Sequence, residues 1–130
     1  MLVLDTNIVL DMFVFSDARV RHLHDELAKG AAWLATLPMR DELERVLRYP
    51  NIVAQMAARQ VRPQEVLATF DARTSMHDSA QAAPVRCKDQ DDQKFIDLAV
   101  AHGAALLSKD AAVLSLTKRL AALGVHVSAA

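Results

Sequence analysis

The chain contains 130 residues, of which 52% are hydrophobic and 24% are charged, a length and composition typical of one compact globular domain. Fifteen Lys and Arg residues against sixteen Asp and Glu residues give a formal net charge of -1, which excludes the strongly basic profile of proteins that coat nucleic acid. With one cysteine, no secretory leader and no apolar run long enough to cross a bilayer, we expect a cytoplasmic protein without a membrane anchor.

Short apolar runs rich in Val, Leu and Ala predict buried strands, separated by longer segments with apolar residues at helical spacing. The predicted strands are, in chain order, residues 2–4, 33–36, 104–107 and 124–127. The predicted helices begin near Asn7, Pro38, Ile52, Gln64, Gln93 and Val113, and residues 74–86 are expected to form an irregular connection. Strands alternating with helices indicate an α/β fold with a central parallel sheet.

Acidic residues follow the predicted strands at their carboxyl ends. Asp5 ends the first strand, Asp110 lies just beyond a later one, and Glu42 lies one turn into the helix that begins at Pro38. A further cluster, Asp89, Asp91 and Asp92, comes directly before the helix predicted from Gln93. Because ligands bind at the carboxyl edge of open parallel sheets, these four stretches are expected to bring their acids to one place.

Carboxylates brought within about 4 Å repel by roughly 4 kcal/mol at an effective dielectric near 20, so such a cluster requires protons or a cation. Hard oxygen ligands without a Cys and His pairing favour Mg²⁺ or Mn²⁺ over zinc. The chemistry that suits this arrangement is metal-assisted hydrolysis of a phosphodiester, in which a water molecule is oriented and deprotonated. No nucleophilic side chain is required.

Each acid also has a purely structural interpretation. Asp110, and either Asp91 or Asp92, are suitable N-caps for the helices that follow them. Glu42 is suitably spaced to pair with Arg45 on the surface of one helix. Asp5 needs a partner if it ends a buried strand, and the helix that starts near Asn7 is one candidate. The joint arrangement favours the functional interpretation for all of them.

The sequence resembles the PIN domain family, the metal-dependent nuclease fold of VapC-like toxins, over residues 2 to about 127. The resemblance rests on four motifs in order: Leu4-Asp5-Thr6-Asn7, Glu42-Leu43, the stretch from Cys87 to Phe95, and His102-Gly103 followed by Leu106 to Asp110. It is strongest to a subgroup described as the toxin components of toxin-antitoxin systems. The sequence departs from the family pattern at Gln90, Gln93 and Ser108, and none of these departures removes a core acid.

The resemblance implies one PIN-like domain over residues 1–130, with a three-layer α/β/α fold, a Mg²⁺ or Mn²⁺ site and cleavage of single-stranded RNA. It assigns catalysis to Asp5, Glu42, Asp92 and Asp110. It assigns metal binding to Asp5, Asp92 and Asp110, with Asp89 and Asp91 in the variable part of the cluster, and leaves open which of the three clustered aspartates is the principal ligand. Asn7 would support Asp5 or lie near the metal site, and Thr6 and Ser108 would supply hydroxyls at the rim, although both hydroxyls are also suitable helix caps.

Cations near the acids are candidates for binding the RNA backbone. They are Arg40, Arg45, Lys88 and Lys109. We therefore expect an RNA substrate, a cognate antitoxin protein and a homodimer. The alternative function is a catalytically silent PIN-like module that binds RNA or protein. A phosphatase or phosphoacceptor domain ranks lower, because no second acid lies two residues after Asp5.

Overall fold

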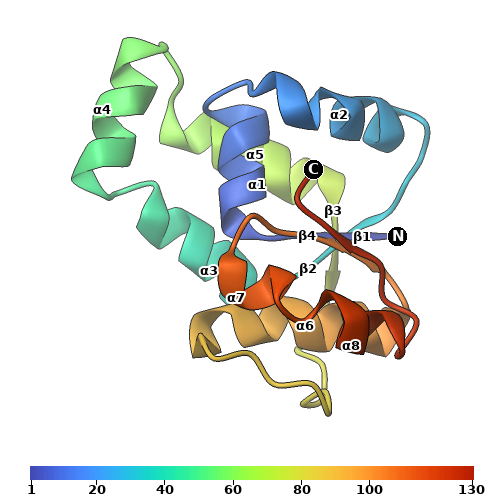
Figure 1. The fold of residues 1–130 in the computed structure, drawn as a ribbon. Helices are drawn as coiled ribbons and strands as arrows, with labels where there is room; N and C mark the ends of the chain where they lie inside the picture. Colours follow the sequence, from blue (N-terminus) through green and yellow to red (C-terminus); the bar gives the residue numbers. More distant parts are fainter.

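The structure is a computed structural model that describes residues 1–130, and its centre is a five-stranded sheet (Figure 1). The strands are β1 (Leu2–Leu4), β2 (Trp33–Thr36), β3 (Thr74–His77), β4 (Ala105–Leu107) and β5 (Val127–Ser128). Their order across the sheet is β3-β2-β1-β4-β5, and every neighbouring pair is parallel. The predicted parallel α/β fold is therefore confirmed.

Helices cover both faces of the sheet and produce three layers (Figure 1). On one side lie α6 (Gln90–His102), α7 (Ala111–Leu114) and α8 (Thr117–Ala121), and on the other lie α1 (Thr6–Phe13), α2 (Arg21–Ala28) and α5 (Pro63–Arg73). The remaining helices are α3 (Leu37–Val46), α4 (Pro50–Ala58) and a short 3-10 helix, Ala18–Val20. None of the helices has the length and apolar character needed to span a bilayer.

The core is one cluster of 35 buried hydrophobic residues that includes the central strands and the inner faces of the helices. All residues of β1 and β2 are buried, as expected for strands covered by helices on both faces. Trp33 of β2 packs edge-to-face on Phe70 of α5, with ring centroids 5.2 Å apart. This packing holds β2, which pairs with β1, the strand that Asp5 follows.

Strand β3 corrects the sequence prediction, which made residues 74–86 an irregular connection. Residues Thr74 to His77 pair in register with Trp33 to Thr36, yet their side chains are only partly buried or exposed. A strand whose side chains are partly or fully exposed on both faces of the sheet needs no apolar alternation. The local sequence therefore contained no strand signal.

Two helix boundaries also differ from prediction. Helix α6 begins at Gln90 rather than near Gln93, so Asp91 and Asp92 lie in its first turn and Asp89 is the N-cap residue. The helix predicted through Val113 and Leu123 is divided into α7 and α8 by a turn. The last strand is shorter than predicted and contains only Val127 and Ser128.

Candidate active site

Asp5 is a buried carboxylate directly after β1. It is 4% exposed, and its Oδ2 atom accepts a hydrogen bond of 2.7 Å from the Ser108 hydroxyl, 103 residues away in the chain. Although Asp5 precedes α1, its side chain makes no capping hydrogen bond. Burial raises the pKa of Asp5, and the negative charge of Glu42 raises it further, whereas the Ser108 hydrogen bond and the backbone N–H groups of Asn7 and Thr6 lower it.

Ser108 connects the two strand ends that carry acids. It is fully buried, and its hydroxyl donates to Asp5 and accepts a 3.1 Å hydrogen bond from the backbone N–H of Asp110. Strand β4 pairs with β1 up to Leu4 and Leu107, which places Ser108 beside Asp5. The predicted rim position of this hydroxyl is wrong, because the side chain lies inside the site.

Three aspartates from two elements converge, and Asp5 is not one of them, although its charge acts on Asp92. Asp89, Asp92 and Asp110 each have a carboxylate oxygen that lies within 4.8 Å of the others. Asp89 and Asp110 are also N-caps, since Asp89 accepts from the N–H of Asp91 at 3.0 Å and Asp110 from the N–H of Ala112 at 2.8 Å. The structural and functional interpretations of these two acids are therefore compatible, and the cap of α6 is Asp89 rather than Asp91 or Asp92.

Asp92 has the electrostatic surroundings of a cation ligand. It is 8% exposed, and its Oδ2 atom is buried without a hydrogen-bond partner. Burial, together with the charges of Asp5, Asp110 and Asp89, raises the pKa of Asp92 to about 7. A buried carboxylate oxygen without a donor is costly, and an oxygen-only donor set suits Mg²⁺ or Mn²⁺. The residues present therefore fit such an ion.

Glu42 approaches the site from α3. Its Oε2 atom accepts a hydrogen bond from the Thr6 hydroxyl, and its Oε1 atom lies 2.9 Å from Lys94 Nζ. The predicted alternative, a surface pair with Arg45, is wrong, because Lys94 of α6 provides the cation. Thr6, predicted at the rim, is buried and bonds to Glu42. The charge of Glu42 acts on Asp5, so these two acids share one electrostatic environment.

Two residues named from the sequence are exposed and do not belong to the three converging aspartates. Asp91 is exposed and is not among the three aspartates whose oxygens converge. Asn7 is exposed on the first turn of α1. The geometry therefore favours Asp92 over Asp91 as the ligand.

The four cations predicted to bind substrate fall into two groups. Arg40 donates two hydrogen bonds to Asp71, of 2.7 and 3.0 Å, and Lys109 Nζ lies 2.6 Å from Asp11 Oδ2. Both cations are therefore paired with carboxylates of the chain itself. The Lys109 pair links the segment before Asp110 to α1. Arg45 and Lys88 are exposed and form no ion pair.

Sequence reasoning did not identify Lys94 and Gln93 as part of the site. Gln93 is buried, and it accepts from Cys87 N–H at 2.6 Å and donates to the Val85 carbonyl at 3.0 Å and to Asp97 at 2.8 Å. It thereby fastens the segment before Asp89 to α6. The only sequence signal was that Gln93 departs from the family pattern, and nothing indicated its partners.

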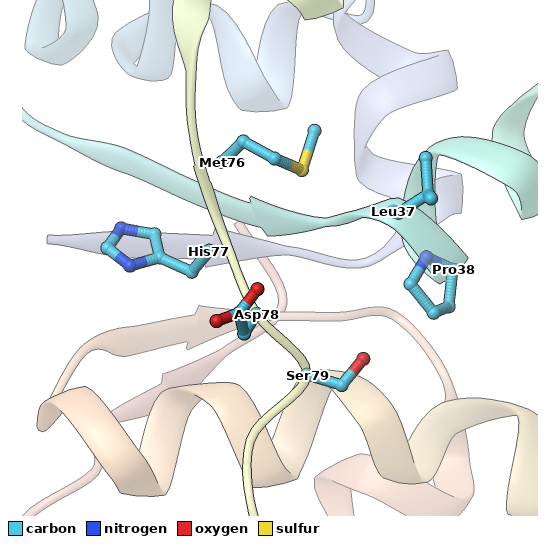
Figure 2. Close-up of a pocket in the computed structure, with 6 residues that line it drawn as sticks. All are labelled: Leu37, Pro38, Met76, His77, Asp78 and Ser79. Atoms are coloured by element: carbon cyan, nitrogen blue, oxygen red, sulfur yellow. The ribbon is translucent and has the colours of Figure 1, made fainter.

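The largest cavity does not contain the acids. It has a volume of about 680 Å³ and lies at the ends of β2 and β3, lined by Leu37, Pro38, Met76, His77, Asp78 and Ser79 (Figure 2). The acids lie farther along the same edge of the sheet, after β1 and β4. We take the acids as the candidate site, because the unpartnered Asp92 oxygen and the converging carboxylates are there.

Comparison with known proteins agrees with this geometry. Residues 1–112 match the PIN domain family, so the chain belongs to that family, whose members are typically nucleases. The fold is similar to a chain in the solved structure of VapBC2 from Rickettsia felis bound to a DNA fragment from their promoter, with a TM-score of 0.64, 15% identity and coverage of 98% of each chain. No curated protein matches the sequence significantly.

Proposed function

We propose that this protein is a divalent-metal-dependent endoribonuclease that hydrolyses phosphodiester bonds of single-stranded RNA. The observation that carries the proposal is the convergence of Asp89, Asp92 and Asp110 within 4.8 Å, with an unpartnered oxygen of Asp92 among them. Membership of the PIN family and the position of the cluster at the carboxyl edge of the sheet support it.

Asp5, Asp92 and Asp110 would hold Mg²⁺ or Mn²⁺, with Asp89 at the exposed side of the cluster. When bound, the ion supplies charge stabilisation for the attacked phosphate and lowers the pKa of water to form the nucleophile. Ser108 fixes the orientation of Asp5 by its 2.7 Å hydrogen bond. The Ser108 hydroxyl also accepts a hydrogen bond from the backbone N–H of Asp110. It therefore sets the spacing between Asp5 and Asp110, two of the proposed ligands.

Glu42 would act beside the ion rather than as its main ligand. Thr6 and Lys94 each bond to one of its two carboxylate oxygens, which fixes the orientation of the group. A carboxylate held in this way accepts hydrogen bonds from the attacking water and orients it. Arg45 and Lys88 are the exposed cations available for the RNA backbone.

A toxin role, with an antitoxin protein as partner, is supported by the similarity of the fold to a chain of the VapBC2 complex. We further propose that the protein acts in the cytoplasm and assembles as a homodimer.

The deciding experiment is cleavage of a labelled single-stranded RNA with Mn²⁺ or Mg²⁺. We expect cleavage by the wild type, its loss in EDTA, and a reduction of at least about a hundredfold in Asp5→Asn and Asp92→Asn. Asp91→Asn is the matched control, because Asp91 lies on the same helix turn but outside the converging group. Equal activity of Asp5→Asn and the wild type, both free of contaminating nuclease, would disprove the assignment.

The second candidate function is a silent PIN-like module that docks RNA or protein. It is favoured by the capping hydrogen bonds of Asp89 and Asp110, which give both acids a structural role. Calorimetric titration with Mn²⁺ separates the two functions, because a silent module should bind no ion at the Asp92 cluster.

A further inference from the structure

The large cavity lies on the same edge of the sheet as the acids. Leu37 and Pro38 begin α3 directly after β2, and residues 76–79 lie at and after the end of β3. Since all strands are parallel, this edge is also the one at which Asp5 follows β1 and Asp110 follows β4. A strand of nucleic acid running along the edge would pass both places.

A smaller cavity of about 70 Å³ adjoins the large one. Ser79 lines both cavities, and Lys94 and Thr36 line the smaller one. The Lys94 ammonium group lies 2.9 Å from Glu42 Oε1. Lys94 and Ser79 therefore link the large cavity, residue by residue, to Glu42.

The walls of the large cavity suit a flat aromatic ring. Leu37 and Met76 are 59% and 48% exposed, so two large apolar side chains are left uncovered at one place. In Figure 2 the Met76 side chain extends toward the side where Leu37 and Pro38 lie, whereas the His77 ring points the other way, where it packs on His102 with centroids 4.7 Å apart. Apolar walls with a thioether make favourable contacts with a ring face.

The polar groups of the cavity favour a base over a phosphate. Asp78 and Ser79 supply a carboxylate and a hydroxyl, and no Lys or Arg lines the cavity. A carboxylate repels phosphate but accepts hydrogen bonds from the N–H groups on a base edge, and the Watson–Crick edge of guanine presents two adjacent donors. Unstacked bases of single-stranded RNA expose these edges and their ring faces.

We propose that this cavity is a nucleobase subsite that holds an unstacked base of the RNA near the cleaved phosphate, with Asp78 selecting guanine. The inference rests on the proposed function, since it assigns the cavity to the same substrate. Its volume of about 680 Å³ lies within the range of roughly 300 to 1,000 Å³ typical of small-molecule sites.

The methionine methyl groups provide a direct test in the metal-free protein. Of the five methionines, Met12, Met39 and Met56 are buried, whereas Met1 and Met76 are exposed. In protein labelled with ¹³C at the methionine methyls, guanosine monophosphate should shift the Met76 signal by its ring current and leave Met1 unchanged. We expect a saturable shift with a dissociation constant in roughly the millimolar range.

Variants then test separately the contributions of the apolar walls and of the Asp78 carboxylate to nucleotide binding. Leu37→Ser should weaken nucleotide binding at Met76, whereas Val53→Ser, at a similarly exposed apolar residue on α4, should not. Guanosine monophosphate should bind about fivefold more tightly than uridine monophosphate, and Asp78→Asn should remove that preference. These residues are exposed, so folding should be unaffected.

The outcomes distinguish the subsite from the proposed function. If the wild type cleaves RNA with Mn²⁺ but no nucleotide shifts Met76, the subsite is wrong and the nuclease stands. A Met76 shift without any cleavage supports nucleobase binding and overturns the nuclease. Equal binding of guanosine and uridine monophosphates, unchanged in Asp78→Asn, overturns the selection of guanine by Asp78. Protection of Met76 by a partner protein and not by nucleotides would identify the cavity as a protein-docking surface and overturn the proposal.

Discussion

Lys94 Nζ lies 2.9 Å from Glu42 Oε1 across 52 residues of sequence, and this contact joins α6 to α3 beside the acids. Lys94→Met leaves the largely buried carboxylate of Glu42 without its cation, so we expect the free energy of unfolding to fall by about 1 to 2 kcal/mol. Urea unfolding of Lys94→Met, Glu42→Gln and the double variant gives the coupling between the residues, expected at about 1 kcal/mol. Arg48→Met, which removes an exposed pair with Glu44, is the control and should change stability by less than about 0.5 kcal/mol. Additive effects of the two substitutions would show that the contact contributes nothing.

Ser108→Ala should weaken the link between the ends of β1 and β4. The fully buried hydroxyl bonds to both Asp5 and the Asp110 N–H, and its removal leaves both groups short of a partner, at a cost of about 1 to 3 kcal/mol in stability. Ser115→Ala removes an exposed hydroxyl that bonds to the Ala112 carbonyl and serves as the matched control. Similar unfolding midpoints for the two variants would contradict the role of Ser108.

The pKa of Asp92 predicts how the stability of the metal-free protein depends on pH. Burial and neighbouring carboxylates raise this pKa to about 7 from its ordinary value of 3.8. Between these values the folded state holds a proton that the unfolded state has released, so the free energy of unfolding contributed by Asp92 decreases as the pH rises. Burial raises the pKa of Asp5 in the same direction.

We therefore expect Asp92→Asn to be more stable than the wild type in EDTA at about pH 8, with the difference shrinking toward about pH 4. Urea unfolding at several pH values measures this difference. A constant difference across the range would show that Asp92 titrates normally.

Mn²⁺ binding should identify the principal ligand among the clustered aspartates. Asp92→Asn removes the oxygen that lacks a protein partner, and we expect at least about a tenfold loss of Mn²⁺ affinity by calorimetry. Asp91→Asn should change the affinity by less than about threefold, because Asp91 is exposed and outside the converging group. The reverse order of the two variants would make Asp91 the ligand.

The salt dependence of RNA binding should distinguish free cations from paired ones. For single strands, each phosphate contact contributes about 0.7 to the slope of log affinity against log salt. Arg45→Gln and Lys88→Gln should each reduce the slope by about this amount if they contact phosphate, whereas Arg40→Gln should leave it unchanged, because Arg40 is bonded to Asp71. Fluorescence anisotropy of labelled RNA in EDTA measures the slopes. An unchanged slope for both Arg45→Gln and Lys88→Gln would place the RNA elsewhere.

The buried strands were predictable because nearly all of their side chains are apolar. Leu2–Leu4 and Trp33–Thr36 are buried throughout, and the run of apolar residues records this in the sequence. Strand β3 was not predictable, since Thr74–His77 is polar at most positions and is defined by pairing with β2. The edge of the sheet was therefore the part that local sequence could not specify.

The acids of the candidate site were predictable from the sequence, whereas their hydrogen-bond partners were not. The residues Asp5 and Asp110 follow strands, and parallel topology alone brings such residues to one edge. The hydrogen-bond partners of the acids were harder to predict, because Lys94 and Thr6 reach Glu42 from helices far apart in the sequence. Long side chains meet according to how helices pack, and one sequence does not record that packing.

The neighbouring positions of β1 and β4 in the sheet also determine when the proposed site can assemble during biosynthesis. Asp5 is translated more than a hundred residues before its hydrogen-bond donor Ser108 and before Asp110. A nascent chain that has not yet reached Ser108 therefore carries only part of the proposed metal-binding group. The proposed site cannot assemble in such a chain, because Asp5 still lacks its hydrogen-bond donor and Asp110 is absent.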